Sequence, residues 1–140
     1  MASLLNLITQ ELSALQDRNM ALIQVNVGLE ELRSMRASHI KHLLHPLDTV
    51  LDDSIGCAIW FAARGRGVDY ITGEEMETPA RVLLLGMGID EQLGGYSRHR
   101  TRYNREGWVG LEDELRMEIL RISERNLGRD NRIVSCVVGV

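Results

Sequence analysis

Hydrophobic residues recur at helical spacing in several segments of the chain. They do so in residues 4–15, 29–45, 49–65 and 110–123. Residues three and four positions apart lie on one face of a helix, so each segment predicts an amphipathic helix. Pro46 is expected to end the second helix, and Asp48 or Thr49 to cap the third.

Other segments have the pattern of strands. In residues 22–28, apolar and polar positions alternate, which is typical of a half-buried strand. Residues 81–86, RVLLLG, form an apolar run closed by glycine, which predicts a strand buried on both faces of a parallel sheet. The last nine residues, 132–140, are also strand-like and end on an apolar note that leaves a sheet edge exposed.

The order of these segments favours an α/β layered domain, because each buried strand needs helices on its faces. Residues 65–80 mix glycine, acidic residues and one proline without a sustained period, and they are interpreted as a loop. Two convincing strands are too few for a complete sheet. We therefore expect residues 1–140 to form one partial domain.

Composition narrows the class of protein. The 140 residues are 44% hydrophobic and 26% charged, which is typical of a soluble globular protein and argues against disorder or a membrane span. The apolar stretch at residues 4–15 lacks a basic leader, so no signal peptide is expected. With Cys57 and Cys136 alone, neither a disulfide framework nor a zinc site is indicated, and we expect a cytoplasmic location. The net charge of -4 gives no general reason to expect nucleic acid or a membrane as partner.

The stretch LLLGMGIDEQLGGYSRHR, residues 83–100, carries the most chemistry. Asp90 and Glu91 follow the predicted buried strand, at the sheet edge where open α/β folds bind ligands. Gly86 and Gly88 would let the backbone approach an anion such as pyrophosphate. Asp90 would suit magnesium, which prefers carboxylates together with phosphate oxygens. The alternative is a simple turn in which Asp90 caps the next helix.

These residues resemble a known family. Residues 83–100, together with RNLGRDNRI at 125–133, are similar to the synthetase region of asparagine synthetase domain-containing proteins, relatives of glutamine-hydrolysing asparagine synthetase. Residues 45–65 are similar to the preceding helix of that family, and the resemblance runs from about residue 25 to 133. It implies a helix-rich α/β fold with a Rossmann-like parallel sheet of the adenine-nucleotide alpha-hydrolase type and flanking helices.

The resemblance also implies a chemistry. In this family, ATP and Mg²⁺ activate the side chain of aspartate as an adenylate, which ammonia derived from glutamine then attacks. Asp90 would correspond to an acid near magnesium and pyrophosphate, with Glu91 and Tyr96 in supporting positions. The predicted nucleotide-binding residues are Gly86, Gly88, Asp90, Glu91 and Arg98, and the predicted metal ligand is Asp90.

The chain also departs from the family pattern. The phosphate loop of the form SGGxDS would lie before Val25, and the sequence there contains nothing like it. No N-terminal cysteine is present to act as the glutaminase nucleophile. Met87 stands where GEGSDE sequences carry a carboxylate, and the chain ends where relatives continue into an arginine-rich segment leading to PFLD. We therefore expect a truncated member that lacks full activity by itself.

Two other classes of function compete with this interpretation. Amphipathic helices beside an incomplete sheet would suit a non-enzymatic module that binds a protein partner or another copy of itself. In residues 97–105, Arg98, Arg102 and Arg105 share a helix face with Tyr103 nearby, an arrangement that would suit nucleic acid. The negative total charge instead favours a solvated face, or one that pairs with the acidic residues of 110–123.

The remaining clusters each have a structural alternative that we favour. His39, His42 and His45 lack an evident fourth metal ligand and are interpreted as surface histidines. The carboxylates Asp48, Asp52 and Asp53 would suit magnesium but are explained by capping and the helix dipole. The motif with Arg125, Arg129, Asp130 and Arg132 would clamp an anion, or form an arginine–aspartate network with Gly128 capping a helix. Both cysteines are expected to be packing thiols.

Overall fold

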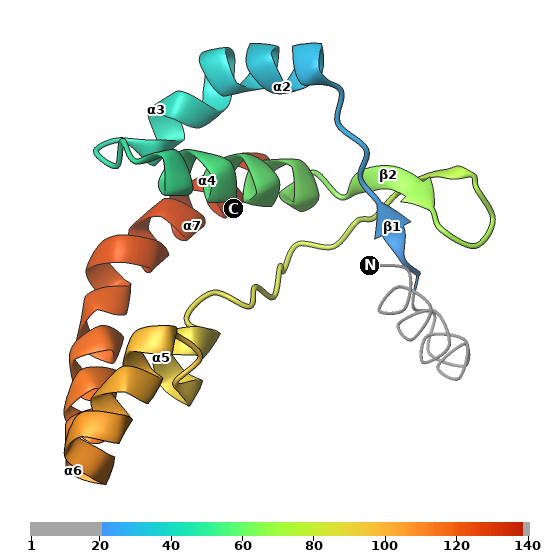
Figure 1. The fold of residues 1–140 in the computed structure, drawn as a ribbon. Coiled ribbons are helices and arrows are strands. Elements are labelled where there is room, and N and C mark those ends of the chain that lie inside the picture. Colours follow the sequence, from blue (N-terminus) through green and yellow to red (C-terminus); the bar gives the residue numbers. More distant parts are fainter. Residues whose placement is uncertain (1–20, 139–140) are drawn as a thin grey trace.

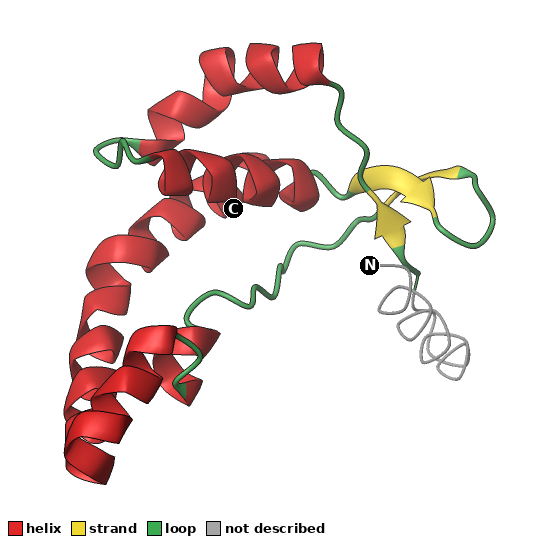
Figure 2. Ribbon diagram, viewed as in Figure 1, coloured by secondary structure: helices red, strands yellow, loops and turns green. Residues whose placement is uncertain are grey.

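The protein is helix-rich, with a small antiparallel sheet at one side (Figures 1 and 2). The computed structural model describes residues 21–138. Its elements are β1 (Ile23–Gln24), α2 (Leu29–Met35), the π-helical η2 (Arg36–Ile40), α3 (Lys41–Leu44), α4 (Val50–Ala63), β2 (Arg66–Asp69), β3 (Glu75–Glu77), α5 (Ile89–Leu93), α6 (Ser97–Ile122), the π-helical η3 (Ser123–Leu127) and α7 (Gly128–Val138). The helix predicted at residues 4–15 lies outside the described residues.

The second and third predicted helices are confirmed. The run α2–η2–α3 ends at Leu44, shortly before Pro46, because the residue before a proline is pushed out of the helical region. Helix α4 starts after Thr49, whose Oγ1 accepts a hydrogen bond from the Asp52 backbone N–H at 3.1 Å. Thr49 is therefore the N-cap, as one of the two residues proposed from the sequence.

The hydrophobic core lies where α4 meets α3 and α7 (Figure 1). Its buried residues are Ile40, Leu44, Cys57, Ile59, Trp60, Phe61 and Ile133. Gly56 allows the close approach, since a Cβ there would lie 2.5 Å from Leu44 Cδ2 and 3.3 Å from Ile133 Cδ1. Residues distant in sequence thus share one interior.

The sheet is antiparallel, with strand order β1-β2-β3. Val68 pairs with Gln24 on one side and with Glu75 on the other. The prediction of a loop over residues 65–80 is therefore wrong, because the segment forms the β2–β3 hairpin. Asp69 Oδ1 closes the turn by accepting the backbone N–H groups of Thr72 and Ile71, each at 2.8 Å, and these bonds lower the pKa of the Asp69 carboxyl.

Residues 81–86 do not form the predicted buried strand. They run as an extended connection between β3 and α5 (Figure 1). Val82 and Leu84 are 78% and 93% exposed, whereas Leu83 and Leu85 pack partly against the core. A strand needs a hydrogen-bonded neighbour, and none pairs with this segment among residues 21–138. The described residues consequently show an antiparallel sheet and no Rossmann-like parallel sheet.

The C-terminal third is helical (Figure 2). The helix predicted at residues 110–123 forms the second part of α6, after a break at Gly107 with φ 66°. The strand predicted at 132–140 is wrong for residues 132–138, which lie in α7. Ile133, Val134 and Val137 follow helical spacing and pack against the core. Gly128 has φ -61° within the continuing helical run, so it is not the predicted C-terminal cap.

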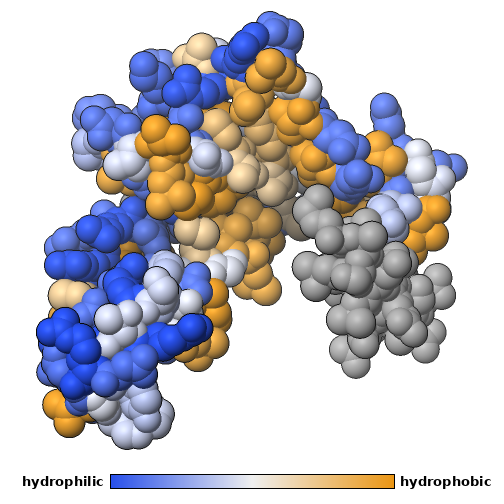
Figure 3. Space-filling view, in the orientation of Figure 1, coloured by the Kyte–Doolittle hydropathy of each residue, from blue (hydrophilic) through white to orange (hydrophobic). Residues whose placement is uncertain are grey.

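Within the part of the chain that the structure describes, no helix combines the length and the hydrophobicity needed to cross a membrane. The lobe formed by α5 and α6 is mostly hydrophilic on the face shown in Figure 3, whereas apolar residues gather nearer to α4.

Candidate functional site

A cleft lined by both polar and apolar side chains lies between the start of α4 and the helical run α6–η3–α7. It has a volume of about 500 Å³, and we call it the α4–α6 cleft. Its charged and polar lining residues are Thr49, Asp52, Glu91, Tyr96, Arg98, Glu118, Arg121, Arg125, Asn126 and Arg129. The cleft thus brings together residues from all three segments that carry the family resemblance.

The Gly86–Gly88 turn leads into α5 beside this cleft. Gly88 has φ 85° and is the N-cap residue of α5, a conformation that L side chains rarely adopt. A Cβ at Gly86 would meet nothing within 4 Å, so the backbone there is open. Asp90 lies in the first turn of α5 rather than at the cap, which overturns the alternative that it merely caps this helix.

Asp90 is exposed and lies beside the cleft rather than in its wall. Its side chain rests against Gly95, where a Cβ would overlap the carboxylate oxygen Oδ1. The Gly95 backbone N–H also donates to the Asp90 carbonyl at 3.0 Å. Gly95 is a residue that sequence reasoning missed. The GG pair after the acidic residues was its only signal.

Glu91 lines the cleft and accepts a hydrogen bond from the Tyr96 hydroxyl at 2.7 Å. This bond to a carboxylate raises the pKa of Tyr96 to about 12, with burial adding to the effect. At neutral pH, Tyr96 therefore remains a hydrogen-bond donor that holds Glu91 in place. Tyr96 is itself held by its backbone N–H, which donates to His99 Nδ1 at 3.3 Å.

Arg98 lies between an aromatic ring and a buried carboxylate. Its Cζ is 3.9 Å from the centre of the Tyr96 ring, and its Nη2 is 2.7 Å from Glu118 Oε1. Glu118 is only 5% exposed, so the guanidinium neutralises a buried charge. The basic face of residues 97–105 therefore pairs in part with the acidic second half of α6, as the sequence favoured.

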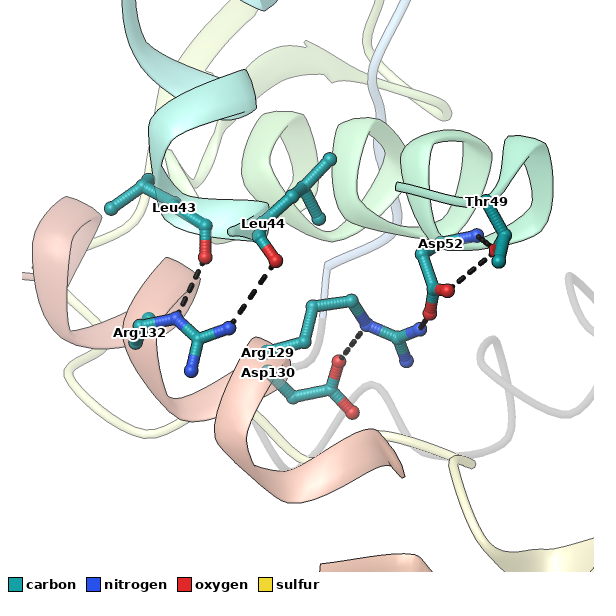
Figure 4. A network of polar contacts seen from close by, with 7 residues as sticks. All are labelled: Leu43, Leu44, Thr49, Asp52, Arg129, Asp130 and Arg132. Atoms are coloured by element: carbon teal, nitrogen blue, oxygen red, sulfur yellow. Dashed lines mark hydrogen bonds and ion pairs between the residues drawn. The ribbon is translucent and has the colours of Figure 1, made fainter. Parts of the chain in front are cut away.

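The RNLGRDNR motif forms a network that joins α7 to α3 and α4 (Figure 4). Arg129 Nη1 is 2.6 Å from Asp52 Oδ1, and Arg129 Nε is 2.7 Å from Asp130 Oδ1. Arg132 donates to the carbonyls of Leu43 at 2.8 Å and Leu44 at 3.4 Å. The structural interpretation of Arg129, Asp130 and Arg132 is thereby confirmed.

Residues 21–138 contain no group of three or more His, Cys, Asp or Glu side chains that could hold a metal ion. Asp53 is paired with Arg36 at 2.7 Å, and Asp52 with Arg129. The buried Cys57 thiol has its pKa raised by burial, which disfavours the reactive thiolate. Cys136 is exposed, so the expectation that it packs in an apolar interior is wrong.

Comparison with known proteins places these residues in a family. The chain is 56% identical over 128 residues to asparagine synthetase domain-containing protein 1 of Gallus gallus, a match covering 89% of this chain and 20% of that protein. It is 53% identical over 116 residues to asparagine synthetase domain-containing protein 1 of Homo sapiens, covering 80% of this chain and 18% of that protein.

A more distant match covers 48% of this chain and 13% of a putative glutamine-hydrolysing asparagine synthetase 1 of Methanocaldococcus jannaschii, at 36% identity. No protein-family model and no solved structure matches the chain. On its sequence, the chain therefore belongs to the asparagine synthetase domain-containing proteins, as a homologue of one segment that makes up about 20% of their length.

Proposed function

We propose that the α4–α6 cleft is part of the nucleotide site of an asparagine synthetase-like ligase. The family reaction would be the ATP-dependent amidation of aspartate to asparagine, with glutamine as nitrogen donor. One observation carries the proposal: residues from 45–65, 83–100 and 125–133, which are separate in sequence, line one cleft. The names of the relatives support the same class of chemistry.

Three of the residues present, Gly86, Gly88 and Asp90, fit ATP and Mg²⁺. The open backbone at Gly86 and the positive φ of Gly88 suit a close approach by phosphate. Asp90 makes no hydrogen bond or ion pair through its carboxylate with another side chain in residues 21–138, so it is free to serve as a metal ligand. Magnesium bound with nucleotides takes only one or two carboxylates together with phosphate oxygens. ATP would supply the activating adenylyl group.

The chain's own residues would position that ligand. Tyr96 keeps its proton and orients Glu91 through the 2.7 Å hydrogen bond. Arg98 neutralises Glu118 and holds the Tyr96 ring. We further propose that residues 1–140 do not complete the reaction by themselves, because Met87 stands where a carboxylate is expected.

The Rossmann-like parallel sheet is also retained as a proposal, for the chain together with the segments that its relatives possess. Its support is the alternation along residues 82–85, where Leu83 and Leu85 face the core and Val82 and Leu84 are exposed. Neighbouring strands and a covering helix would bury the exposed pair. A cytoplasmic location is proposed from the free thiols of Cys57 and Cys136.

Calorimetric titration with MgATP tests the proposed function. We expect binding by the 140-residue chain that is lost in Asp90→Ala. Asp113→Ala is the matched control, since it removes an exposed carboxylate from α6 outside the cleft. Absence of MgATP binding, or equal binding by both variants, would overturn the proposal.

The exposed apolar residues favour a second candidate function, a protein-interaction module. Val82, Leu84, Trp108 and Val109 are each at least 73% exposed, and large exposed apolar side chains are a common feature of interaction surfaces. The module would bind a protein partner or a second copy of the chain. Light scattering after size-exclusion chromatography is expected to show concentration-dependent assembly that the Leu84→Asp variant lacks, whereas a monomer at every concentration would argue against self-association.

A further inference from the structure

We propose that Arg121 and Arg125 form an oxyanion-binding subsite in the α4–α6 cleft. The inference rests on the proposed function for the location of the ligand, and it goes further by naming the residues that would hold an anionic group. It concerns the end of the cleft formed by the last turn of α6 and by η3.

The carboxylates in the cleft wall are already partnered. Asp52 is paired with Arg129 at 2.6 Å, and Glu118 with Arg98 at 2.7 Å. Glu91 accepts the Tyr96 hydroxyl at 2.7 Å. These contacts give each of the three acids a partner, and they also occupy Arg98 and Arg129. The charges of Asp52 and Glu118 are therefore neutralised by arginines, whereas Glu91 is only hydrogen-bonded and keeps its negative charge.

Arg121 and Arg125 are different. Both line the cleft, and neither has a carboxylate within 4.0 Å or a side-chain hydrogen bond in the described part of the chain. They are four positions apart in a continuous helical run, so their side chains lie on the same face. Each guanidinium offers five donors in a fixed fork that suits carboxylate or phosphate oxygens.

A buried donor at the same wall also lacks an acceptor. Arg129 is 2% exposed, and its Nη1 and Nε are bonded to Asp52 and Asp130, respectively. Its Nη2 has no hydrogen-bond partner among residues 21–138, and no dashed line reaches it in Figure 4. A buried donor without an acceptor is costly. It therefore points, independently of Arg121 and Arg125, to a polar group that the described residues do not supply.

The chemistry that fits is a small oxyanion, either a phosphate or a carboxylate. Both ligands present adjacent oxygens that accept hydrogen bonds from two guanidinium groups. The cleft volume of about 500 Å³ is in the range of small-molecule sites. Apolar side chains of Leu47, Leu51, Ile55, Met87 and Ile122 line the remainder and would contact the less polar part of such a ligand.

The test titrates the 140-residue chain with pyrophosphate in one arm and succinate in the other, by calorimetry at low salt. We expect one of the probes to bind, with an affinity at least about tenfold weaker in Arg121→Gln/Arg125→Gln. Arg100→Gln is the matched control because Arg100 is an exposed arginine of α6 outside the cleft. Circular dichroism checks the fold, and the two single variants serve if the double variant unfolds.

Each outcome separates the subsite from the proposed function. Pyrophosphate binding that depends on the arginines assigns a phosphate subsite, and succinate binding assigns a carboxylate subsite. Such binding without MgATP binding would leave the subsite standing and overturn the nucleotide function. No binding of either probe, or equal affinity in wild type and double variant, would overturn the subsite even if MgATP binds through Asp90.

Discussion

Two regions of this molecule are held together by different physical means. Where α4 packs on α3 and α7, the buried side chains are mainly apolar, including Ile40, Trp60 and Ile133, with the Arg129–Asp130 pair as the charged exception. In α6, the buried side chains are His99 and Glu118, both polar. The face shown in Figure 3 agrees, with a hydrophilic lobe at α5 and α6 and apolar residues nearer to α4.

The difference separates stability from ligand chemistry. Apolar burial is non-directional and increases with buried area, so the α4–α7 core supplies the general driving force for folding. Ion pairs and hydrogen bonds are directional, so the contacts of Arg98 and Tyr96 fix side-chain positions around the cleft. Substitutions in the first region should lower stability, and those in the second should mainly change the cleft.

The largest effect is expected in the apolar region. Ile133 is 0% exposed, and Ile133→Ala should lower the free energy of unfolding by about 4 kcal/mol, because it removes buried methyl groups and leaves a cavity. Urea unfolding measures the change. Leu120→Ala is the control, since Leu120 is 72% exposed and should change stability by less than about 0.5 kcal/mol. Equal losses would show that α7 does not anchor the core.

Arg129 connects the two regions, and its removal should be nearly as costly. Arg129→Met would leave Asp52 and the buried Asp130 without their partner. We expect a loss of about 3 kcal/mol in urea unfolding, since breaking a buried pair leaves an uncompensated charge. Arg116→Met removes an exposed pair with Glu112 and should cost about 0.5 kcal/mol. A loss for Arg129→Met no greater than this control would contradict a structural role for the network.

Close packing at Gly56 gives a smaller effect. The added Cβ of Gly56→Ala would meet Leu44 and Ile133, so overpacking should lower the free energy of unfolding by about 2 kcal/mol. At Gly28, an added Cβ meets nothing within 4 Å. Gly28→Ala is therefore expected to leave the free energy of unfolding almost unchanged when both variants are compared by urea unfolding. Neutral behaviour at both positions would mean that α4 crosses its neighbours less closely.

The smallest effect concerns the polar region and depends on pH. The hydrogen bond to Glu91 raises the folded-state pKa of Tyr96 to about 12. A raised pKa means that the protonated phenol is stabilised by folding, so its contribution is complete below the unfolded pKa of about 10 and is lost as pH rises towards 12.

Unfolding of wild type and Tyr96→Phe between pH 8 and 12 would show this loss as converging stabilities. The control Tyr103→Phe should show no such pH-dependent difference in stability from wild type, because the Tyr103 hydroxyl makes no hydrogen bond in residues 21–138. A wild-type advantage that stays unchanged from pH 8 to 12 would contradict the Tyr96–Glu91 bond.

Local pattern was sufficient for the long helices. The segments 29–45, 49–65 and 110–123 each carry an apolar stripe at helical spacing, and each is helical. The first two end near the predicted positions, whereas 110–123 lies within a longer helical run that begins at Ser97 and continues through η3 and α7. Hydrogen bonds within a helix join residues four apart, so the information is local. The family resemblance was likewise contained in short motifs, and its match over most of the chain confirms it.

The local sequence pattern did not determine the secondary structure of the short apolar segments, because periodicity alone does not separate a strand from a buried helix. Residues 132–138 became helical where Ile133 meets α4, and residues 81–86 are unpaired because no strand of residues 21–138 lies beside them. The roles of the arginines were equally indistinct in sequence. The tertiary structure alone decided that Arg129 is buried between two carboxylates, while Arg121 and Arg125 face the cleft without a carboxylate partner among residues 21–138, since ion pairing depends on distances between segments far apart in the chain.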